Sequence, residues 1–434
     1  MSPVGVGIIG IFFLFLLLAL RMQISFSMAL VGFLGFALLG SLEAGFSILG
    51  MVAFRTGTAY SLSVIPLFIL MGQFANYSRM GFEIYETAYR WLGFLPGGLS
   101  MATTGACAGF AAISGSSLAT AATMGMVALP EMRRFKYDDS LATGCIAAGG
   151  TLGILIPPST VLIIYGILTE QPIATLFIAG ILPGLLLSGL FMLTIYVMTK
   201  YNPTLGPPGP RFTMKERIYS LKGTWSILSL FLLVMGGLYT GWFTPTEAAG
   251  VGAFGAFFVT IIKRRLTWGN LKGSLAETTK TTAMVFAILI GANIFGYFLT
   301  ISQIPDQLSG WIAGLGLNRF IIMWILIFAY IVLGCFMEGL AIMVLTIPIV
   351  YPMVIGMGFD PIWFGIIITL VMEMSLITPP VGVNVFIISG VAKDVPMYTI
   401  FRGILPFWVA MFVCIILLII FPQIALFLPV TMSH

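Results

Sequence analysis

Two short stretches decide the fold of this chain: GTLGILIPPS at residues 150–159 and LITPPVGVN at residues 376–384. Each places two consecutive prolines inside a long apolar segment that would otherwise form one helix. Proline lacks a backbone N–H and its ring clashes with the preceding turn, so the helix must open at both places. The sequence therefore predicts two broken helices, at 140–168 and 361–391, each with unpaired backbone groups at its centre.

The rest of the chain is apolar enough to lie in a membrane. Its 434 residues are 59% hydrophobic and only 8% charged, with a mean hydropathy of +1.09, whereas ordinary globular proteins carry roughly 25% charged residues. Since a helix needs about 20 apolar residues to cross a bilayer, we predict an all-α integral membrane protein. Full crossings are predicted at 3–20, 24–42, 58–78, 140–168, 173–199, 224–243, 247–262, 281–301, 361–391 and 403–429.

Two further apolar stretches, 97–130 and 319–352, each fall into two pieces around a small polar centre. The centres are Ser114–Ser117 and Met337–Gly339. Each stretch could form two thin spans, or a re-entrant hairpin that enters and leaves by one face. The sequence leaves this alternative open, and the loops fall on the same sides under both interpretations.

Basic residues indicate the orientation. With these spans, 18 of the 20 Lys and Arg residues fall on one face, and the other face receives only Arg55 and Arg319. Because positive residues concentrate in cytoplasmic loops, the crowded face is predicted to be cytoplasmic and both termini periplasmic. The net charge of +5 is therefore explained by topology, and no nucleic-acid binding is predicted.

The two halves of the chain match at a spacing near 222 residues. IPP at 156–158 corresponds to TPP at 378–380, and GILP at 180–183 recurs at 403–406. Each half contains about five crossings and one split stretch, and an odd number of crossings inverts the second copy, as in secondary transporters. We predict a first repeat at 1–199, a Pro-rich cytoplasmic linker at 200–222 and a second repeat at 223–434.

Each half also contains an amphipathic stretch, at 81–95 and at 267–280. Both are predicted to form interfacial helices with an apolar face on the membrane. As paired arms they could brace a moving core against a static frame. Simple anchoring at the interface is the alternative.

The split stretches and the broken helices provide oxygen ligands for cations. Ser114, Ser116 and Ser117 place three hydroxyls in four residues, which packing of small residues alone does not explain. Meeting the first broken helix around Gly150 and Thr151, this tip offers hydroxyl and carbonyl oxygens to one sodium ion. Its repeat mate at 334–339 is predicted to meet Thr378 and hold a second.

Two glutamates, Glu338 and Glu373, lie deep in apolar sequence. A carboxylate at mid-membrane is costly and by default a functional candidate, although a protonated glutamate that only packs is the alternative. No Arg or Lys lies near either proline pair, so an anion would be recognised by half-helix N-termini. Ser117, Ser159 and Asn384 are placed to add side-chain hydrogen bonds.

Several classes of activity lack the residues they need. The one histidine, His434, is the last residue, and the four cysteines show no Cys-x-x-Cys spacing, which argues against His-ligated metal and redox sites. An intramembrane serine hydrolase would lack a base for its serine, so no enzyme activity is predicted. A channel remains the alternative, although it would not need two closing tips.

Four motifs spread along the chain carry a family resemblance: AISGSS at 112–117, GTLGILIPPS at 150–159, PTEAA at 245–249 and TPPVGVN at 378–384. Together they resemble the large membrane subunit of tripartite ATP-independent periplasmic (TRAP) transporters, the DctM/SiaM-like M subunit. The resemblance implies a sodium-coupled importer of the ion-transporter-type elevator fold in the bacterial inner membrane. It also implies a small four-helix membrane subunit and a periplasmic substrate-binding protein as partners.

The implied cargo is a small organic anion, a carboxylate or a sulfonate, with about two sodium ions and no organic cofactor. The predicted sodium ligands are Ser114, Ser116, Gly150, Thr151, Gly334, Met337, Glu338, Thr378 and Val381. The predicted substrate contacts are Ser116, Ser117, Pro158, Ser159, Glu338, Pro380 and Asn384.

Overall fold

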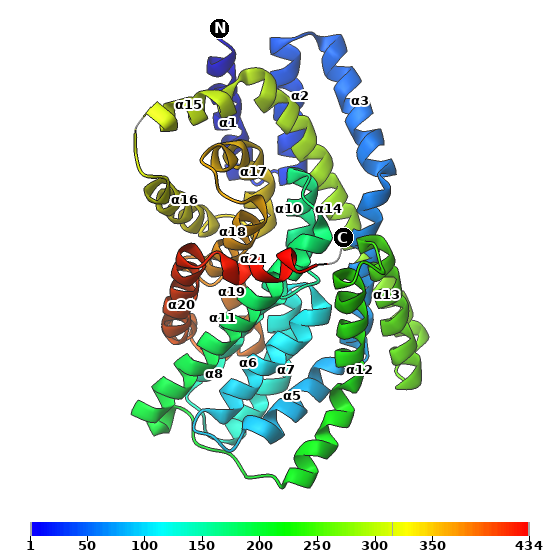
Figure 1. Ribbon diagram of the computed structural model, residues 1–434, viewed down its shortest axis with the longest axis vertical. Helices are drawn as coiled ribbons and strands as arrows, with labels where there is room; N and C mark the ends of the chain where they lie inside the picture. The colour runs from blue at the N-terminus through cyan, green and yellow to red at the C-terminus, as the bar shows by residue number, and fades with distance from the viewer. Residues whose placement is uncertain (1, 315, 433–434) are drawn as a thin grey trace.

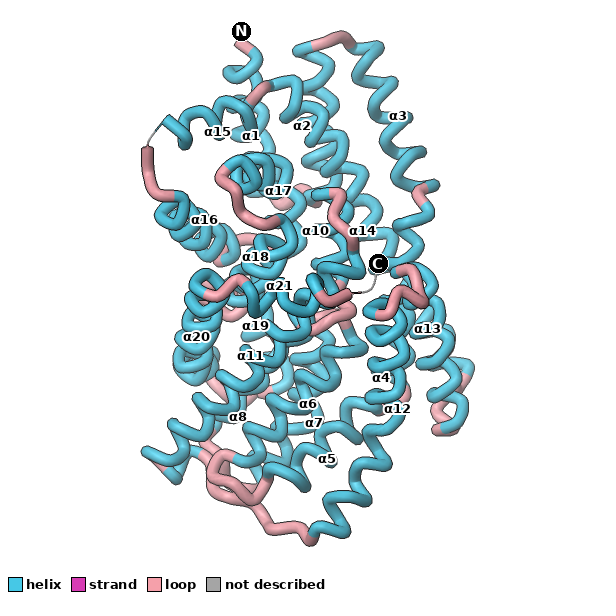
Figure 2. Tube along the Cα trace, in the orientation of Figure 1, coloured by secondary structure: helices cyan, strands magenta, loops and turns pink. Residues whose placement is uncertain are grey.

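A computed structural model describes residues 2–314 and 316–432, and the described residues form helices and loops without a strand (Figures 1 and 2). Six of these helices are long and apolar enough to cross a membrane, and eight do so if two bent helix pairs each count as one span. The predicted all-α membrane class is confirmed. His434 lies outside the described residues.

The first half contains eleven α-helices in chain order, with a short 3-10 turn at Tyr60–Ser63 and another at Pro203–Leu205. They are α1 (Pro3–Ala19), α2 (Ile24–Leu39), α3 (Leu42–Thr58), α4 (Val64–Tyr77), α5 (Met80–Leu92), α6 (Gly98–Ser114), α7 (Ser117–Arg134), α8 (Asp139–Gly150), α9 (Leu152–Leu155), α10 (Thr160–Thr169) and α11 (Ile173–Tyr201).

The second half repeats this order with fewer interruptions. Its helices are α12 (Met214–Tyr239), α13 (Pro245–Ile262), α14 (Trp268–Ser302), α15 (Ile304–Gly314), α16 (Arg319–Gly334), α17 (Gly339–Gly356), α18 (Pro361–Ser375), α19 (Val383–Val391), α20 (Met397–Ile420) and α21 (Gln423–Val430).

The spacing of about 222 residues pairs the helices of the two halves. It relates α1 to α12, α2 to α13, the bent pair α3 and α4 to α14, α5 to α15, and α11 to α20. Packing follows the same pairing, because α2 packs along α14 while α13 packs along α4, and α7 packs on α19 while α17 packs on α10. The halves therefore interlock instead of forming two separate bodies.

Both split stretches are helical hairpins. The first consists of α6 and α7 and the second of α16 and α17, each with a short turn between its helices. The two turns line one cavity inside the molecule, at residues 114–119 and 338–340. Of the two alternatives that the sequence leaves open, the structure has hairpins whose tips end in the interior.

Both predicted helix interruptions are present. The first separates α9 from α10 at residues 156–159, and the second separates α18 from α19 at 376–382. The Pro157–Pro158 and Pro379–Pro380 bonds are both cis. The first proline pair is buried and the second is exposed, so the two breaks differ in their surroundings.

The base of the first hairpin is tied to both broken helices. The Arg133 guanidinium at the end of α7 lies 3.3 Å from Asp139 at the start of α8 and 2.9 Å from Asp394, which follows α19. The hydrogen bond from Arg133 lowers the pKa of the Asp394 carboxyl below its ordinary value of 3.8. This contact helps to join the hairpin and the broken helices into one unit.

The predicted interfacial arm at 267–280 is helical but is not a helix of its own. These residues are the N-terminal part of α14, a continuous helix of 35 residues that begins where the Thr267 hydroxyl accepts the Asn270 N–H at 3.1 Å. The change from polar to apolar composition near residue 281 does not stop the helix, because no proline interrupts it. The repeat mate of α5 is α15, and each follows a residue with φ of 60°, Arg79 and Gln303.

Other element boundaries also differ from the prediction. Helix α3 lies between two predicted crossings, 24–42 and 58–78, and precedes α4 at a 54° bend. The irregular part of the linker is only 202–213, because a reciprocal capping box between Thr213 and Glu216 starts α12 inside the predicted 200–222 segment. The final predicted span, 403–429, begins earlier, at Met397, and is divided into α20 and α21 at Phe421 and Pro422.

Candidate functional site

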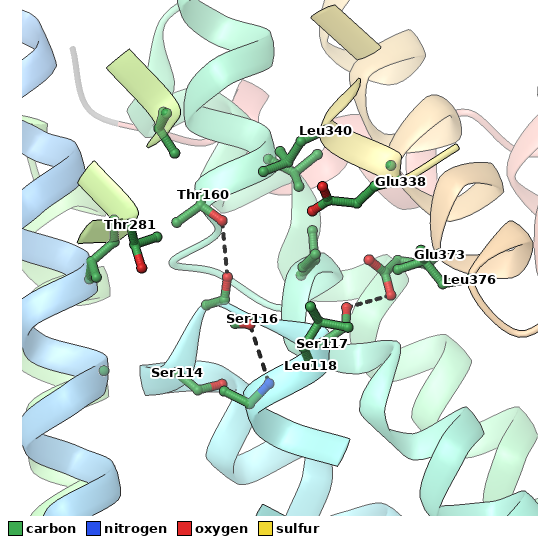
Figure 3. Close-up of a pocket in the computed structure, with 18 of the residues that line it drawn as sticks. Ser114, Ser116, Ser117, Leu118, Thr160, Thr281, Glu338, Leu340, Glu373 and Leu376 are labelled. Carbon is green, nitrogen blue, oxygen red and sulfur yellow. Dashed lines mark hydrogen bonds between the residues drawn. The ribbon is translucent and has the colours of Figure 1, made fainter. Parts of the chain in front are cut away.

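A cavity of about 280 Å³, here called the central cavity, lies where both hairpin tips and both broken helices meet α4 and α14 (Figure 3). Its polar lining consists of Gln73, Asn76, Ser114, Ser116, Ser117, Thr160, Thr281, Glu338 and Glu373. Among the residues lining it, Glu338 and Glu373 are the ionisable ones. A ligand here meets hydroxyls, amides and two carboxyl groups drawn from both halves.

The first hairpin tip is held by its own hydroxyls and by the first broken helix. The Ser116 hydroxyl accepts the Ala119 N–H at 3.3 Å and so caps α7, as expected for serine at a helix start. Thr160 donates to the Gly115 carbonyl at 3.3 Å. Gly115 has a φ of +60°, and a Cβ there would lie 2.8 Å from the Pro158 carbonyl oxygen, so only glycine fits this approach.

The residues predicted for the first sodium site come together around this tip. The Ser114 hydroxyl lies 2.8 Å from that of Thr120. A Cβ at Gly150 would lie 3.2 Å from the Ser117 carbonyl oxygen, so the tip backbone rests directly on α8. Thr151 is buried beside it and donates to the Ala148 carbonyl at 2.6 Å. The region is rich in hydroxyl and carbonyl oxygens, the ligand types that hard cations prefer.

The residues predicted for the second sodium site are less closely gathered. Gly334 lies directly against Ser375 at the end of α18. The Thr378 hydroxyl donates to the Met374 carbonyl at 2.7 Å and accepts the Trp408 indole N–H at 3.1 Å. One lone pair of Thr378 therefore stays available to a cation. The sequence analysis did not identify Trp408, since it lies 30 residues further along the chain.

Of the remaining residues predicted for this second site, Glu338 lines the central cavity, whereas Met337 and Val381 are half-buried outside its lining.

The predicted substrate contacts divide into two groups. Ser116, Ser117 and Glu338 line the central cavity, whereas Pro158, Ser159, Pro380 and Asn384 lie outside its lining. The Ser159 hydroxyl is occupied as the N-cap of α10, where it accepts the Leu162 N–H at 3.3 Å. The Asn384 amide donates to the Ala147 carbonyl at 3.4 Å and so joins α19 to α8.

A buried hydrogen bond links the two halves in the cavity wall. The Ser117 hydroxyl donates to the Glu373 carboxyl at 2.6 Å (Figure 3), and both side chains are almost fully buried. Glu373 was a candidate from the sequence, but its partner lies 256 residues away. No local pattern could have indicated this pairing, which only the interlocking of the repeats produces.

Comparison with known proteins identifies close relatives over most of the chain. The sequence profile described as "Tripartite ATP-independent periplasmic transporter, DctM component" matches residues 11–424. The chain is 38% identical to the C4-dicarboxylate TRAP transporter large permease protein DctM of Pseudomonas aeruginosa, over 88% of this chain and 89% of that protein.

Two further relatives have other named cargoes. The sialic acid TRAP transporter large permease protein SiaM of Vibrio cholerae is 33% identical, over 85% of this chain and 86% of that protein. The isethionate TRAP transporter permease protein DctMQ of Oleidesulfovibrio alaskensis is 34% identical over 88% of this chain, which corresponds to 60% of that longer protein.

A solved structure shares the fold. The Alcanivorax borkumensis YdaH transporter, described as having an unusual topology, superposes with a TM-score of 0.56 over 90% of this chain and 88% of that one. At 14% identity this likeness concerns the fold alone.

Proposed function

The chain belongs to the DctM family of tripartite ATP-independent periplasmic transporters, and on that basis we propose that it imports a small organic anion together with sodium ions. The observation that carries the proposal is the central cavity, which is bounded by both hairpin tips and both broken helices. Broken helices at the repeat interface are where secondary transporters bind substrate and coupling ions.

Bound sodium ions would offset the repulsion between an anion and the carboxylates of the central cavity. The ionisable side chains in its lining are Glu338 and Glu373, and an incoming anion would be repelled by ionised carboxylates. Cations held by the tip at 114–117 with Gly150, and by the second tip with Thr378, would offset this repulsion. Anion and sodium would then bind more tightly together than separately, which is the physical basis of coupled import.

The central cavity has one wall of hairpins and broken helices and an opposite wall of α4 and α14, an arrangement that fits an elevator motion. The hairpins and broken helices pack on one another, with α7 against α8 and α19 and α17 against α10. The opposite wall comes from α4 and α14. In our proposal the first group is the moving unit, and α1–α4 with α12–α14 form the static frame.

The cargo class comes from the relatives. Their names refer to C4-dicarboxylates, sialic acid and isethionate, which are all organic acids. We extend that class to this chain and propose that a small membrane subunit and a periplasmic substrate-binding protein complete the transporter. The proposed location is the bacterial inner membrane, with both termini on the periplasmic side.

Reconstitution into liposomes with those two partners tests the proposal. Labelled succinate, sialic acid and isethionate would be offered with and without an inward sodium gradient. We expect at least one to accumulate only when both the gradient and the periplasmic protein are present. Accumulation that ignores sodium, or that needs no delivery protein, would contradict the proposal and favour a channel.

A further inference from the structure

A second cavity, of about 410 Å³, lies between the same two groups of helices. Its frame side comes from α3, the turn before α4, and α14, and its other side comes from α10 with Pro348 of α17. The residue lining it that carries a positive charge is Arg55. The proposed function so far gives this cavity no role.

The two cavities are lined by the same face of α14. Thr281 and Val285 line the central cavity, and Leu289, Asn293 and Thr300 line the second. Successive positions are separated by four or seven residues, so they form one stripe along the helix. At 1.5 Å per residue, the centres of the two lined segments, Thr281–Val285 and Leu289–Thr300, lie about 17 Å apart.

Helix α4 and the turn before it also line both cavities, but their residue numbers run in the opposite direction. Ile69, Gln73 and Asn76 line the central cavity, and Ala59 and Leu62 line the second. Since α4 packs against α14, the two helices form a track with two positions. The moving unit occupies the first position in this structure, where the Thr123 hydroxyl donates to the Asn76 side chain at 3.2 Å.

From this geometry we infer that the second cavity is the other end position of the substrate site, and that Arg55 binds the acidic group of the organic anion there. The inference rests on the proposed function, because it assumes that the moving unit carries an anion. A shift of about 17 Å along α14 would bring the hairpin tips opposite Arg55. Guanidinium groups match carboxylate and sulfonate oxygens in geometry and charge.

Charges around Arg55 support this assignment. Glu170 also lines the second cavity, but no ion pair within 4.0 Å joins it to Arg55 among the described residues. Glu170 belongs to the loop after α10, which travels with the moving unit. The shift would carry Glu170 away and leave Arg55 facing the tips, the anion and the two glutamates of the central cavity.

Cysteine cross-linking tests the two positions without any substrate. In a chain whose four native cysteines are replaced by alanine, Thr123→Cys would be paired with Asn76→Cys for the position seen here. The same shift of about 17 Å is about eleven residues along α4 and predicts a second pairing, of Thr123→Cys with Ile65→Cys. We expect both pairs to cross-link in membranes. Absence of the second cross-link, with the first present, would overturn the inference.

Anion affinity in each cross-linked species then tests Arg55. Binding of labelled succinate, sialic acid and isethionate would be measured on the complex with the small subunit, without the periplasmic protein. We expect Arg55→Ala to weaken binding roughly tenfold to a hundredfold in the second species and to leave the first unchanged. Arg55→Lys should restore part of the affinity, because lysine keeps the positive charge but cannot donate two parallel hydrogen bonds to the acidic group.

Arg319→Ala is the matched control, because Arg319 is the other basic residue predicted on that face and it stacks on Phe320 and Phe359 outside both cavities. It should change neither affinity. An equal loss for Arg55→Ala in both species, or no loss in either, would contradict the assignment of Arg55. If the intact wild-type transporter accumulates none of the three anions, the proposed function fails, while the cross-links still decide whether there are two positions.

Discussion

At the scale of single residues, one buried polar contact in the wall of the central cavity joins the two halves. Ser117 and Glu373 form one hydrogen bond across the two halves. A buried polar group without a partner costs free energy, whereas a satisfied one is nearly neutral. The contact therefore specifies how the first hairpin tip seats on α18.

Ser117→Ala should destabilise the protein, because it leaves the buried Glu373 carboxyl without its hydroxyl donor. The expected loss is about 1–3 kcal/mol, the cost of an unsatisfied buried polar group. Thermal unfolding of the purified protein measures it. Ser226→Ala is the matched control, since the Ser226 hydroxyl is buried and has no hydrogen-bond partner among the residues that the structure describes. Equal losses for the two variants would contradict a special role of the Ser117 contact.

Thr378→Ala should weaken the dependence of uptake on sodium more than it lowers expression. The substitution removes one predicted ligand oxygen and also the acceptor of the Trp408 indole. We expect the sodium concentration for half-maximal uptake to rise roughly tenfold, which corresponds to about 1.4 kcal/mol. Thr369→Ala is the control, because that hydroxyl is buried in α18 and donates to the Gly365 carbonyl of its own helix at 2.8 Å. Unchanged sodium dependence in Thr378→Ala would remove this residue from the site.

Sequence reasoning succeeded at residues whose effect is local. A proline pair opens its own helix, so both breaks could be located without the structure. Ser159 as an N-cap and the capping box of Thr213 and Glu216 had sequence signals that were missed. The Ser117–Glu373 bond and the Trp408 contact had none, because their partners meet only after the two halves interlock.

At the scale of helices, close backbone approach decides which elements pack together. Helices α8 and α20 touch at Gly144 and Gly403, where a Cβ on either glycine would overlap the backbone of the other helix. The GILP motif that reveals the repeat in the sequence thus has a packing role in the second half. Its glycine permits a contact that no larger residue allows.

Gly403→Ala should destabilise the protein by about 1–3 kcal/mol, because the added methyl group has no free space between α8 and α20. Gly390→Ala is the matched control in α19, where a Cβ would meet no atom within 4 Å. That variant should be neutral or slightly stabilising, since alanine favours helix over glycine. Unfolding midpoints of the two variants in one detergent give the comparison. A stable Gly403→Ala would show that the two helices can separate at no cost.

The boundary predicted between the arm at 267–280 and the following span is absent for a physical reason. Composition changes from polar to apolar near residue 281, but a helix ends only where its backbone is interrupted or capped. Gln303, with a φ of 60°, provides that end 22 residues later. A periodic pattern shows which face of a helix is apolar and gives little information on where the helix stops.

At the scale of the whole molecule, the two halves hold each other. Helix α2 packs along α14 and α13 packs along α4, so each half completes the core of the other. In the linker, the Gly206 carbonyl accepts the Gly97 N–H and the Gly209 N–H donates to the Gly93 carbonyl. Pro210 and Arg211, which follow these bonds in the chain, are exposed.

A protease site inserted between Pro210 and Arg211 should therefore leave the fold intact after cleavage. We expect both fragments to co-purify and to elute together in size-exclusion chromatography, because the interlocked helices bury far more apolar surface than the linker. The matched control is residues 1–210 expressed alone, which should aggregate. Separation of the fragments after cleavage would show that the linker, and not the packing, holds the halves together.

Helices α4 and α14 run past the two cavities in opposite directions, since the lining residues rise in number along one and fall along the other. The two helices that line the proposed path are therefore antiparallel, as expected for inverted repeats. Antiparallel walls of this kind do not by themselves impose a direction of transport. If the proposed coupling holds, the gradients of sodium and anion set the net direction of transport, and a reversed sodium gradient should drive efflux along the same path.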